Sequence, residues 1–259
     1  DIMGMAAEDF PEMPSVGNGK NIIVDGKILS EMVKGTFFAT AQNEGAKPVL
    51  TGINVTIEDG VMQFVAIDGY RLAIRKQKVD ISDDFSFIVS GKAILEAVKL
   101  IDEETEKVEI SVGERLISFN INGYDFISRL FEGEFVNYKK TIPTEHMQRV
   151  VVNTRELTNT VERVSLLISE SFSTPVRCYF NELNVVFTCA TSMGRATETF
   201  NTKVEGDSFE IGLNSRYLLE ALKAAETEQV QILFNGPNNG VLIEPLEGED
   251  FKYMIMPMR

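Results

Sequence analysis

The sequence predicts an α+β protein in which two domains repeat one plan of helices and antiparallel strands. Its 259 residues are enough for two ordinary domains, and 44% of them are hydrophobic, which allows each domain a core. The segment at 92–99, Lys-Ala-Ile-Leu-Glu-Ala-Val-Lys, returns in chemical type at 216–223, and the segment at 25–33 returns at 153–161. We therefore expect an incoming linker at 1–19, one domain at 20–143 and a second domain at 144–259.

Four segments carry apolar residues at helical spacing. In the first of them Ile28, Met32 and Val33 recur at intervals that place them on one helix face. Asn153 and Asn214 stand where the last two helices would begin and are their expected N-caps. We expect four helices that include the segments 25–37, 92–99, 153–161 and 216–223.

Runs of β-branched and aromatic residues between these helices are typical of strands. The dipeptides Asp59-Gly60, Asp68-Gly69 and Asn122-Gly123 separate several of the runs and favour tight hairpin turns. The expected unit is a strand, a helix and a three-stranded meander, used twice per domain. In the first domain we expect the meander strands at 48–57, 61–67 and 72–79, and at 107–112, 116–121 and 124–130.

The composition argues against several classes of function. The net charge of −14 is incompatible with a uniformly basic surface that coats nucleic acid. His146 is the single histidine and lies in a predicted linker, so neither a histidine-based metal site nor a catalytic triad is expected. The segment at 17–20, Gly-Asn-Gly-Lys, does not complete a phosphate-binding loop. We expect no catalysis, no cofactor and no metal ion.

The two cysteines and the apolar runs indicate a cellular compartment. Cys178 and Cys189 fall on two predicted strands at positions that do not face each other, so we expect two reduced, buried thiols. No apolar run reaches the roughly 18 residues of a membrane helix, and no charged-then-apolar leader opens the sequence. We expect a soluble, cytoplasmic protein. Because Asp1 and not Met is the first residue, we expect a fragment of a longer gene product.

Each predicted helix carries two basic residues about two turns apart. A spacing of seven or eight residues returns to nearly the same face, so four such pairs could line one surface for a phosphate backbone. The alternative is a solvated face on which Glu31, Glu96 and Glu220 form salt bridges with the basic residues four positions before them. From the pattern alone we favour this alternative. The pairs are Lys27 with Lys34, Lys92 with Lys99, Arg155 with Arg163, and Arg216 with Lys223.

Two short sequence motifs are more specific than the helix pattern. They are Ala-Ile-Asp-Gly-Tyr-Arg-Leu-Ala at 66–73 and Tyr-Met-Ile-Met-Pro-Met-Arg at 253–259. Together with Phe-Val-Asn-Tyr at 135–138 and the helix repeat, they resemble the bacterial DNA sliding clamp family, the β subunit of DNA polymerase III. That family has three domains, of which this chain resembles the second and third. The resemblance implies a DNA-clamp fold with two inner helices and outer antiparallel sheets in each domain, and a non-catalytic role.

The same resemblance implies the partners. Two three-domain protomers would close head to tail into a homodimer ring around duplex DNA, whose sequence is not read, and the eight basic residues would face the DNA. Replicative and repair polymerases and the clamp loader would bind through a short peptide with a glutamine and apolar residues. The peptide pocket would be formed by Leu50, Ile67, Gly69, Tyr70, Arg71, Leu72, Val136, Lys140, Thr141, Asn214, Tyr217, Met254, Ile255, Met256, Pro257, Met258 and Arg259.

Two less specific interpretations remain open. The protein could be an adaptor that binds such peptides without touching DNA, in which case the helix bases serve as salt-bridge partners. The apolar tail at 254–258 could also be an ordinary edge strand that fills its own core.

Overall fold

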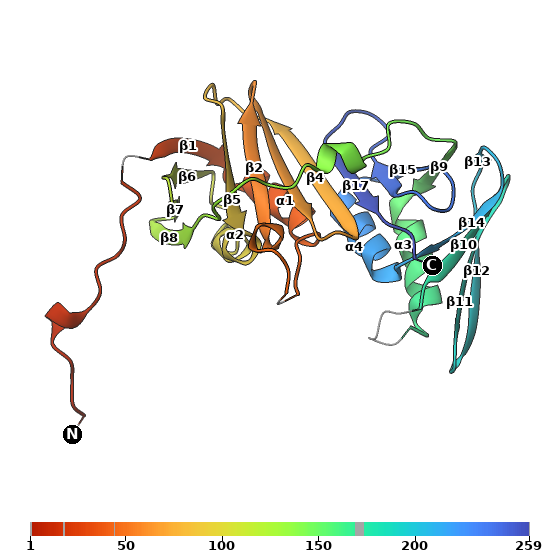
Figure 1. The fold of residues 1–259 in the computed structure, drawn as a ribbon, viewed down its shortest axis with the longest axis horizontal. Helices are drawn as coiled ribbons and strands as arrows, with labels where there is room; N and C mark the ends of the chain where they lie inside the picture. Colours follow the sequence, from red (N-terminus) through yellow and green to blue (C-terminus); the bar gives the residue numbers. More distant parts are fainter. Residues whose placement is uncertain (1, 18, 44, 169–173, 259) are drawn as a thin grey trace.

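The computed structural model describes residues 2–17, 19–43, 45–168 and 174–258. Its elements follow the predicted plan in both halves of the chain (Figure 1). The first half contains β1 (Lys20–Asp25), α1 (Gly26–Phe37), β2 (Gly52–Glu58), β3 (Val61–Ile67), β4 (Arg71–Lys78), β5 (Phe85–Ser90), α2 (Gly91–Val98), β6 (Lys107–Val112), β7 (Leu116–Ile121) and β8 (Tyr124–Arg129). The second half contains β9 (Gln148–Asn153), α3 (Thr154–Ser165), β10 (Val176–Asn181), β11 (Asn184–Thr191), β12 (Gly194–Asn201), β13 (Val204–Glu205), β14 (Phe209–Leu213), α4 (Ser215–Ala225), β15 (Gln229–Phe234), β16 (Val241–Glu244) and β17 (Phe251–Ile255).

The helices begin at side-chain caps. The carbonyl oxygen of the Asn153 side chain accepts a hydrogen bond from the Glu156 N–H at 3.0 Å, and that of Asn214 accepts one from the Tyr217 N–H at 3.2 Å. Asp25 caps α1 in the same way. Both predicted N-caps are confirmed, because each side chain satisfies a donor that the first helical turn leaves unpaired.

One predicted strand starts later than expected. The residues at 48–51 form a short 3-10 helix, η2 (Pro48–Thr51), and β2 begins at Gly52. Pro48 has no N–H to donate to a sheet, and its fixed φ suits a first helical turn. The Thr51 hydroxyl then donates to the Pro48 carbonyl at 2.7 Å. The predicted strand at 48–57 was therefore wrong over its first four residues.

Three antiparallel sheets organise the chain. Two have four strands, in the orders β1-β6-β7-β8 and β12-β11-β10-β14. The third has nine strands, in the order β13-β9-β15-β16-β17-β4-β3-β2-β5, and runs through both halves of the molecule because β17 pairs with β4. Since β16 pairs with the other side of β17, this strand is interior. The interpretation of the tail as an edge strand was therefore wrong for Met254 and Ile255.

The four helices form one row, in which α1, α2 and α4 pack on the nine-stranded sheet and α3 packs mainly on β11 and β12 of a four-stranded sheet. They contact one another in the order α2, α1, α4, α3, and α1 and α4 meet where the two halves of the chain join (Figure 1). Their apolar stripes, which include Leu29 and Val33 on α1 and Leu218 and Leu222 on α4, are buried in the main core. Away from these stripes, each helix carries exposed polar residues.

A second apolar cluster covers the other face of the same sheet. Side chains alternate along a strand, so that Ala73 and Tyr253 belong to the helix-side core, whereas Leu72 and Met254 belong to the second cluster. Tyr138, in the 3-10 helix η3 (Tyr138–Thr141) of the segment that connects the two halves, packs into this cluster. Both halves of the chain and their connection thus share one small core.

The cysteines and the histidine lie as predicted. Cys178 faces Phe187 across one strand pair and Cys189 faces Ala196 across another, and both thiols are free and buried. His146 is exposed in the segment before β9. Each helix that the structure describes is too short or too polar to pass through a bilayer.

Candidate nucleic-acid interface and peptide site

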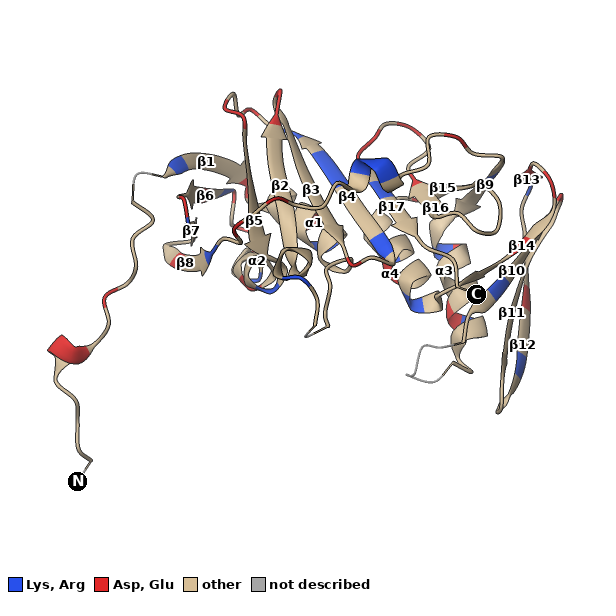
Figure 2. Ribbon diagram, viewed as in Figure 1, with Lys and Arg blue, Asp and Glu red and all other residues tan. Residues whose placement is uncertain are grey.

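All eight predicted DNA-facing residues lie at exposed positions of the helix row. The four helices together with Lys99, directly after α2, hold these eight basic residues and five acidic ones, although the whole chain has a net charge of −14. The surplus negative charge therefore lies on the strands and loops, and Figure 2 shows red segments concentrated at the strand ends and connections. The helix row therefore has a positive balance within an acidic chain.

Five of the eight basic side chains contact a carboxylate. These pairs are Lys27–Glu31 at 3.9 Å, Lys99–Glu96 at 2.6 Å, Arg163–Glu198 at 3.0 Å, Arg216–Glu220 at 2.9 Å and Lys223–Glu162 at 2.6 Å. Among the residues that the structure describes, Lys34, Lys92 and Arg155 have no such pair.

The partners differ in part from the predicted ones. Glu31 and Glu220 bond the basic residues four positions before them, as expected, but Glu96 bonds Lys99 and not Lys92. A helix brings residues at both three and four positions apart together, so the sequence spacing does not choose between Lys92 and Lys99. These pairs lie largely in solvent, where salt screens them, and a phosphate can compete for the same cations.

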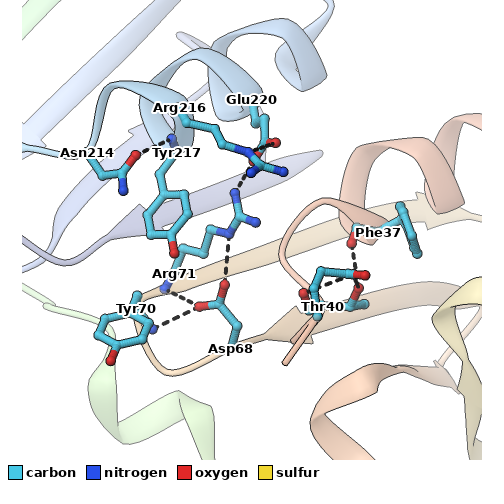
Figure 3. Close-up of polar contacts among 10 residues, drawn as sticks. Phe37, Thr40, Asp68, Tyr70, Arg71, Asn214, Arg216, Tyr217 and Glu220 are labelled. Atoms are coloured by element: carbon cyan, nitrogen blue, oxygen red, sulfur yellow. Dashed lines mark hydrogen bonds and ion pairs between the residues drawn. The ribbon is translucent and has the colours of Figure 1, made fainter. Parts of the chain in front are cut away.

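The predicted pocket residues gather where β4, β17 and α4 meet. Leu72 pairs with Met254 and Arg71 pairs with Ile255 across the two strands, and Ile67 packs against the same second cluster. The Arg71 guanidinium lies 4.1 Å from the centre of the Tyr217 ring, and the Tyr217 N–H donates to Asn214, which caps α4 (Figure 3). Residues from both halves of the chain therefore meet at this junction.

The residues after β17 continue along this junction. The Met256 N–H donates to the Tyr70 carbonyl, and the Met258 N–H donates to the Gly212 carbonyl, both at 2.8 Å. Tyr70 and Met256 are exposed, at 62% and 37%, whereas Leu72 and Met254 are buried at 0% and 3%. An incoming side chain would therefore contact Tyr70 and Met256 before it reached Leu72 and Met254.

The remaining predicted pocket residues belong to other segments. Gly69, in the turn before β4, has φ +93°, a backbone conformation that favours glycine. Val136, Lys140 and Thr141 belong to the connecting segment, where the Thr141 hydroxyl donates to the Tyr138 carbonyl at 2.6 Å. Leu50 lies in η2, which adjoins β2 and β5, two and three strands away from β4 in the sheet. Pro257 is half-buried, and Arg259 lies outside the described residues.

Sequence reasoning missed three residues at this junction. Asp68 bonds Arg71 at 3.0 Å, Glu220 forms a second ion pair with Arg71, and both carboxylates come from outside the predicted pocket set. A Cβ at Gly240 would lie 2.9 Å from the Met254 side chain, so glycine makes room for the methionine. The motif at 66–73 contains Asp68 and could have revealed it, but no local pattern connects Glu220 or Gly240 to the site.

No group of three or more His, Cys, Asp or Glu side chains with metal-binding geometry occurs among the described residues. Burial raises the pKa of the Tyr217 hydroxyl and of the Tyr138 hydroxyl, so both rings stay protonated at neutral pH. At the junction they act as neutral aromatic surfaces with one hydrogen-bonding atom each.

The chain matches two family models along nearly its whole length. Residues 23–137 match the central domain of the DNA polymerase III beta subunit, and residues 139–259 match its C-terminal domain. The chain is 28% identical to the beta sliding clamp of Bacillus subtilis and 31% identical to that of Halalkalibacterium halodurans, in each case over all of this chain and 70% of the relative.

The fold agrees with solved structures of such proteins. The crystal structure of the DNA polymerase sliding clamp from Bacillus subtilis superposes with a TM-score of 0.94 at 27% identity, over 98% of this chain and 68% of that one. The sliding clamp of Pseudomonas aeruginosa gives a TM-score of 0.91 at 28% identity, over 98% and 70%. The predicted α+β clamp fold is confirmed.

Proposed function

Because the chain belongs to the DNA polymerase III beta subunit family, we propose that it acts without catalysis as part of a sliding clamp, a head-to-tail homodimer ring that encircles duplex DNA and tethers polymerases. The observation that supports DNA contact is the helix row, in which neighbouring helices carry eight exposed basic residues in an acidic chain. Contacts of this kind are sequence-independent and allow sliding, since they attract phosphate without reading bases.

The experiment on DNA contact uses the three helix cations that have no ion pair in the described part of the chain. Replacing Lys34, Lys92 and Arg155 by Gln should make the salt dependence of binding to a labelled duplex shallower by about 0.9 per lost phosphate contact in log–log slope. Fluorescence anisotropy against salt concentration measures this slope.

A matched variant separates local contact from net charge. Replacing Lys20, Arg129 and Arg177, which are exposed cations on strands, by Gln removes the same charge and should leave the slope unchanged. Equal slopes for the two triple variants would reject the helix row as the DNA-facing surface.

We also propose that replicative and repair polymerases and the clamp loader bind at the junction of β4, β17 and α4 through a short peptide. The exposed Tyr70 and Met256 lie beside a backbone hydrogen bond that joins their two segments, and they present apolar surface to an incoming side chain. Methionine adapts its shape to different partner side chains, which suits a site shared by several proteins.

Calorimetric titration with a synthetic peptide that carries one glutamine and three apolar residues tests this site. Tyr70→Ala and Met256→Ala should each weaken binding at least tenfold, as expected for an anchor residue. Tyr124→Ala and Met193→Ala are the controls, because these side chains are also exposed, at 66% and 82%, but lie on β8 and in the β11–β12 turn. A loss of affinity in the controls of the same size would argue against this location.

The adaptor without DNA contact is the second candidate. It is favoured by the five helix cations that already bond carboxylates. It predicts normal peptide binding together with a salt slope that the helix triple variant does not change.

A further inference from the structure

One carboxylate lies between the proposed peptide site and the proposed DNA-facing surface. Glu220 on α4 forms an ion pair with Arg71 through Oε2 and accepts a hydrogen bond from the Arg216 Nε through Oε1 at 2.9 Å (Figure 3). Arg71 belongs to the predicted pocket, and Arg216 belongs to the predicted DNA-facing set. A single side chain therefore contacts both sites.

The Arg71 side chain, which bonds one oxygen of Glu220, is buried. The Arg71 side chain is 5% exposed, the Asp68 carboxylate bonds its Nε at 3.0 Å, and the Tyr217 ring lies against its guanidinium. A buried guanidinium cannot turn to water when a partner is lost, so its orientation depends on its two carboxylates. Glu220 comes from the other half of the chain and holds Arg71 against α4.

The Arg216 side chain, which bonds the other oxygen of Glu220, is exposed to solvent. The Arg216 side chain is 51% exposed, and the Glu220 carboxylate that it shares with Arg71 is 28% exposed. A phosphate oxygen offers an arginine a charge-assisted hydrogen bond at least as strong as that of a surface carboxylate. When Arg216 turns to a phosphate, Glu220 loses one of its two cations and its charge acts on Arg71 alone.

We propose that Glu220 positions Arg71 for peptide binding and that phosphate contact at Arg216 strengthens this positioning, so that DNA and peptide bind with positive coupling. The inference rests on the proposed function, because it needs both sites. Coupling of binding is reciprocal, so that DNA must raise peptide affinity by the same factor by which peptide raises DNA affinity.

The test is a peptide titration at low ionic strength, with and without a saturating short duplex DNA. For the unmodified chain, DNA should lower the peptide Kd about fivefold. Glu220→Gln should reduce this ratio to one, because the amide keeps the shape but loses the charge that both arginines share. Glu31→Gln is the matched control, since Glu31 bonds Lys27 at the same four-residue spacing on α1, and it should keep the ratio.

A second variant separates coupling from simple structural support. Arg216→Gln frees Glu220 for Arg71 permanently, so this variant should bind peptide without DNA as tightly as the unmodified chain does with DNA, and DNA should add nothing. Weaker peptide binding by Arg216→Gln, or a ratio that survives Glu220→Gln, would overturn the coupling. An unmodified chain that binds both ligands with a ratio of one would overturn it as well, whereas failure to bind peptide or DNA at all would contradict the proposed function itself.

Discussion

Arg71 occupies a position in which burial and charge oppose each other. Its guanidinium is removed from water, which costs several kcal/mol for an ion without partners, and it is compensated by Asp68 and Glu220 and by the face of the Tyr217 ring. Because Glu220 and Tyr217 come from the other half of the chain, the full compensation exists only when the two halves are joined.

Removing the buried charge of Arg71 should destabilise the folded chain. We expect Arg71→Ala to lower the free energy of unfolding by about 3 kcal/mol, because it leaves two carboxylates close together at the junction. Arg115→Ala is the control, since its side chain is 82% exposed and its pair with Glu132 is 3.5 Å long, and it should change the free energy by less than about 0.5 kcal/mol. Urea unfolding followed by circular dichroism measures both. Equal losses for the two variants would contradict this account of Arg71.

Some contacts between individual residues could be predicted from the sequence, and others could not. The bond from Asp68 to Arg71 spans three residues inside a recognisable motif, and that from Glu220 to Arg216 spans one helical turn. The ion pair between Arg71 and Glu220 joins residues 149 positions apart, which no local periodicity predicts. The site of greatest functional interest was therefore the part that sequence spacing could not supply.

Helices and strands were predictable to different degrees. Helix starts were readable because an Asn cap and an apolar stripe are both local signals, as at Asn153 and Asn214. The short helix at Pro48 was not readable, because a proline followed by apolar residues fits a strand end as well as a first helical turn. The interior position of β17 was not readable either, since its pairing with β4 depends on how the two halves meet.

The cap of α3 gives a quantitative test at the scale of one element. Asn153→Ala should cost about 1 kcal/mol of unfolding free energy, because the Glu156 N–H loses its side-chain acceptor. Asn159→Ala, at an exposed position inside the same helix, should instead stabilise slightly, because alanine has the higher helix propensity. Both changes replace Asn by Ala, but we expect the first to lower the free energy of unfolding and the second to raise it. A thermal melt that shifts both midpoints in the same direction would refute the cap as the cause.

The whole molecule is held together by one nine-stranded sheet. The pairing of β17 with β4 is flanked on the helix side by the contact between α1 and α4, where Arg75 donates to the Ala224 carbonyl at 2.7 Å. The Arg75 side chain lies directly against Gly35 of α1, where a Cβ would overlap it. The second apolar cluster closes the opposite face. These contacts lead us to expect that the two halves unfold as one cooperative unit.

The cysteines provide a probe of this cooperativity, because both lie in the second half of the chain. Burial raises the pKa of Cys178 and of Cys189, so the folded molecule offers no reactive thiolate at neutral pH, and labelling by a thiol reagent requires opening. When reclosing is faster than labelling, the labelling rate follows the population of open molecules.

A cavity in the first half should therefore expose thiols in the second half. We expect Ile94→Ala in α2 to cost about 3 kcal/mol and to raise the labelling rate about a hundredfold, as much as Leu222→Ala in α4, because both side chains are 1% exposed. Leu166→Ala, at a side chain that is 81% exposed, should leave the rate unchanged. Mass spectrometry of the labelled chain measures the rates under native conditions. If Leu222→Ala accelerated labelling and Ile94→Ala did not, the second half would open by itself, and the continuous sheet would join two independently folding domains.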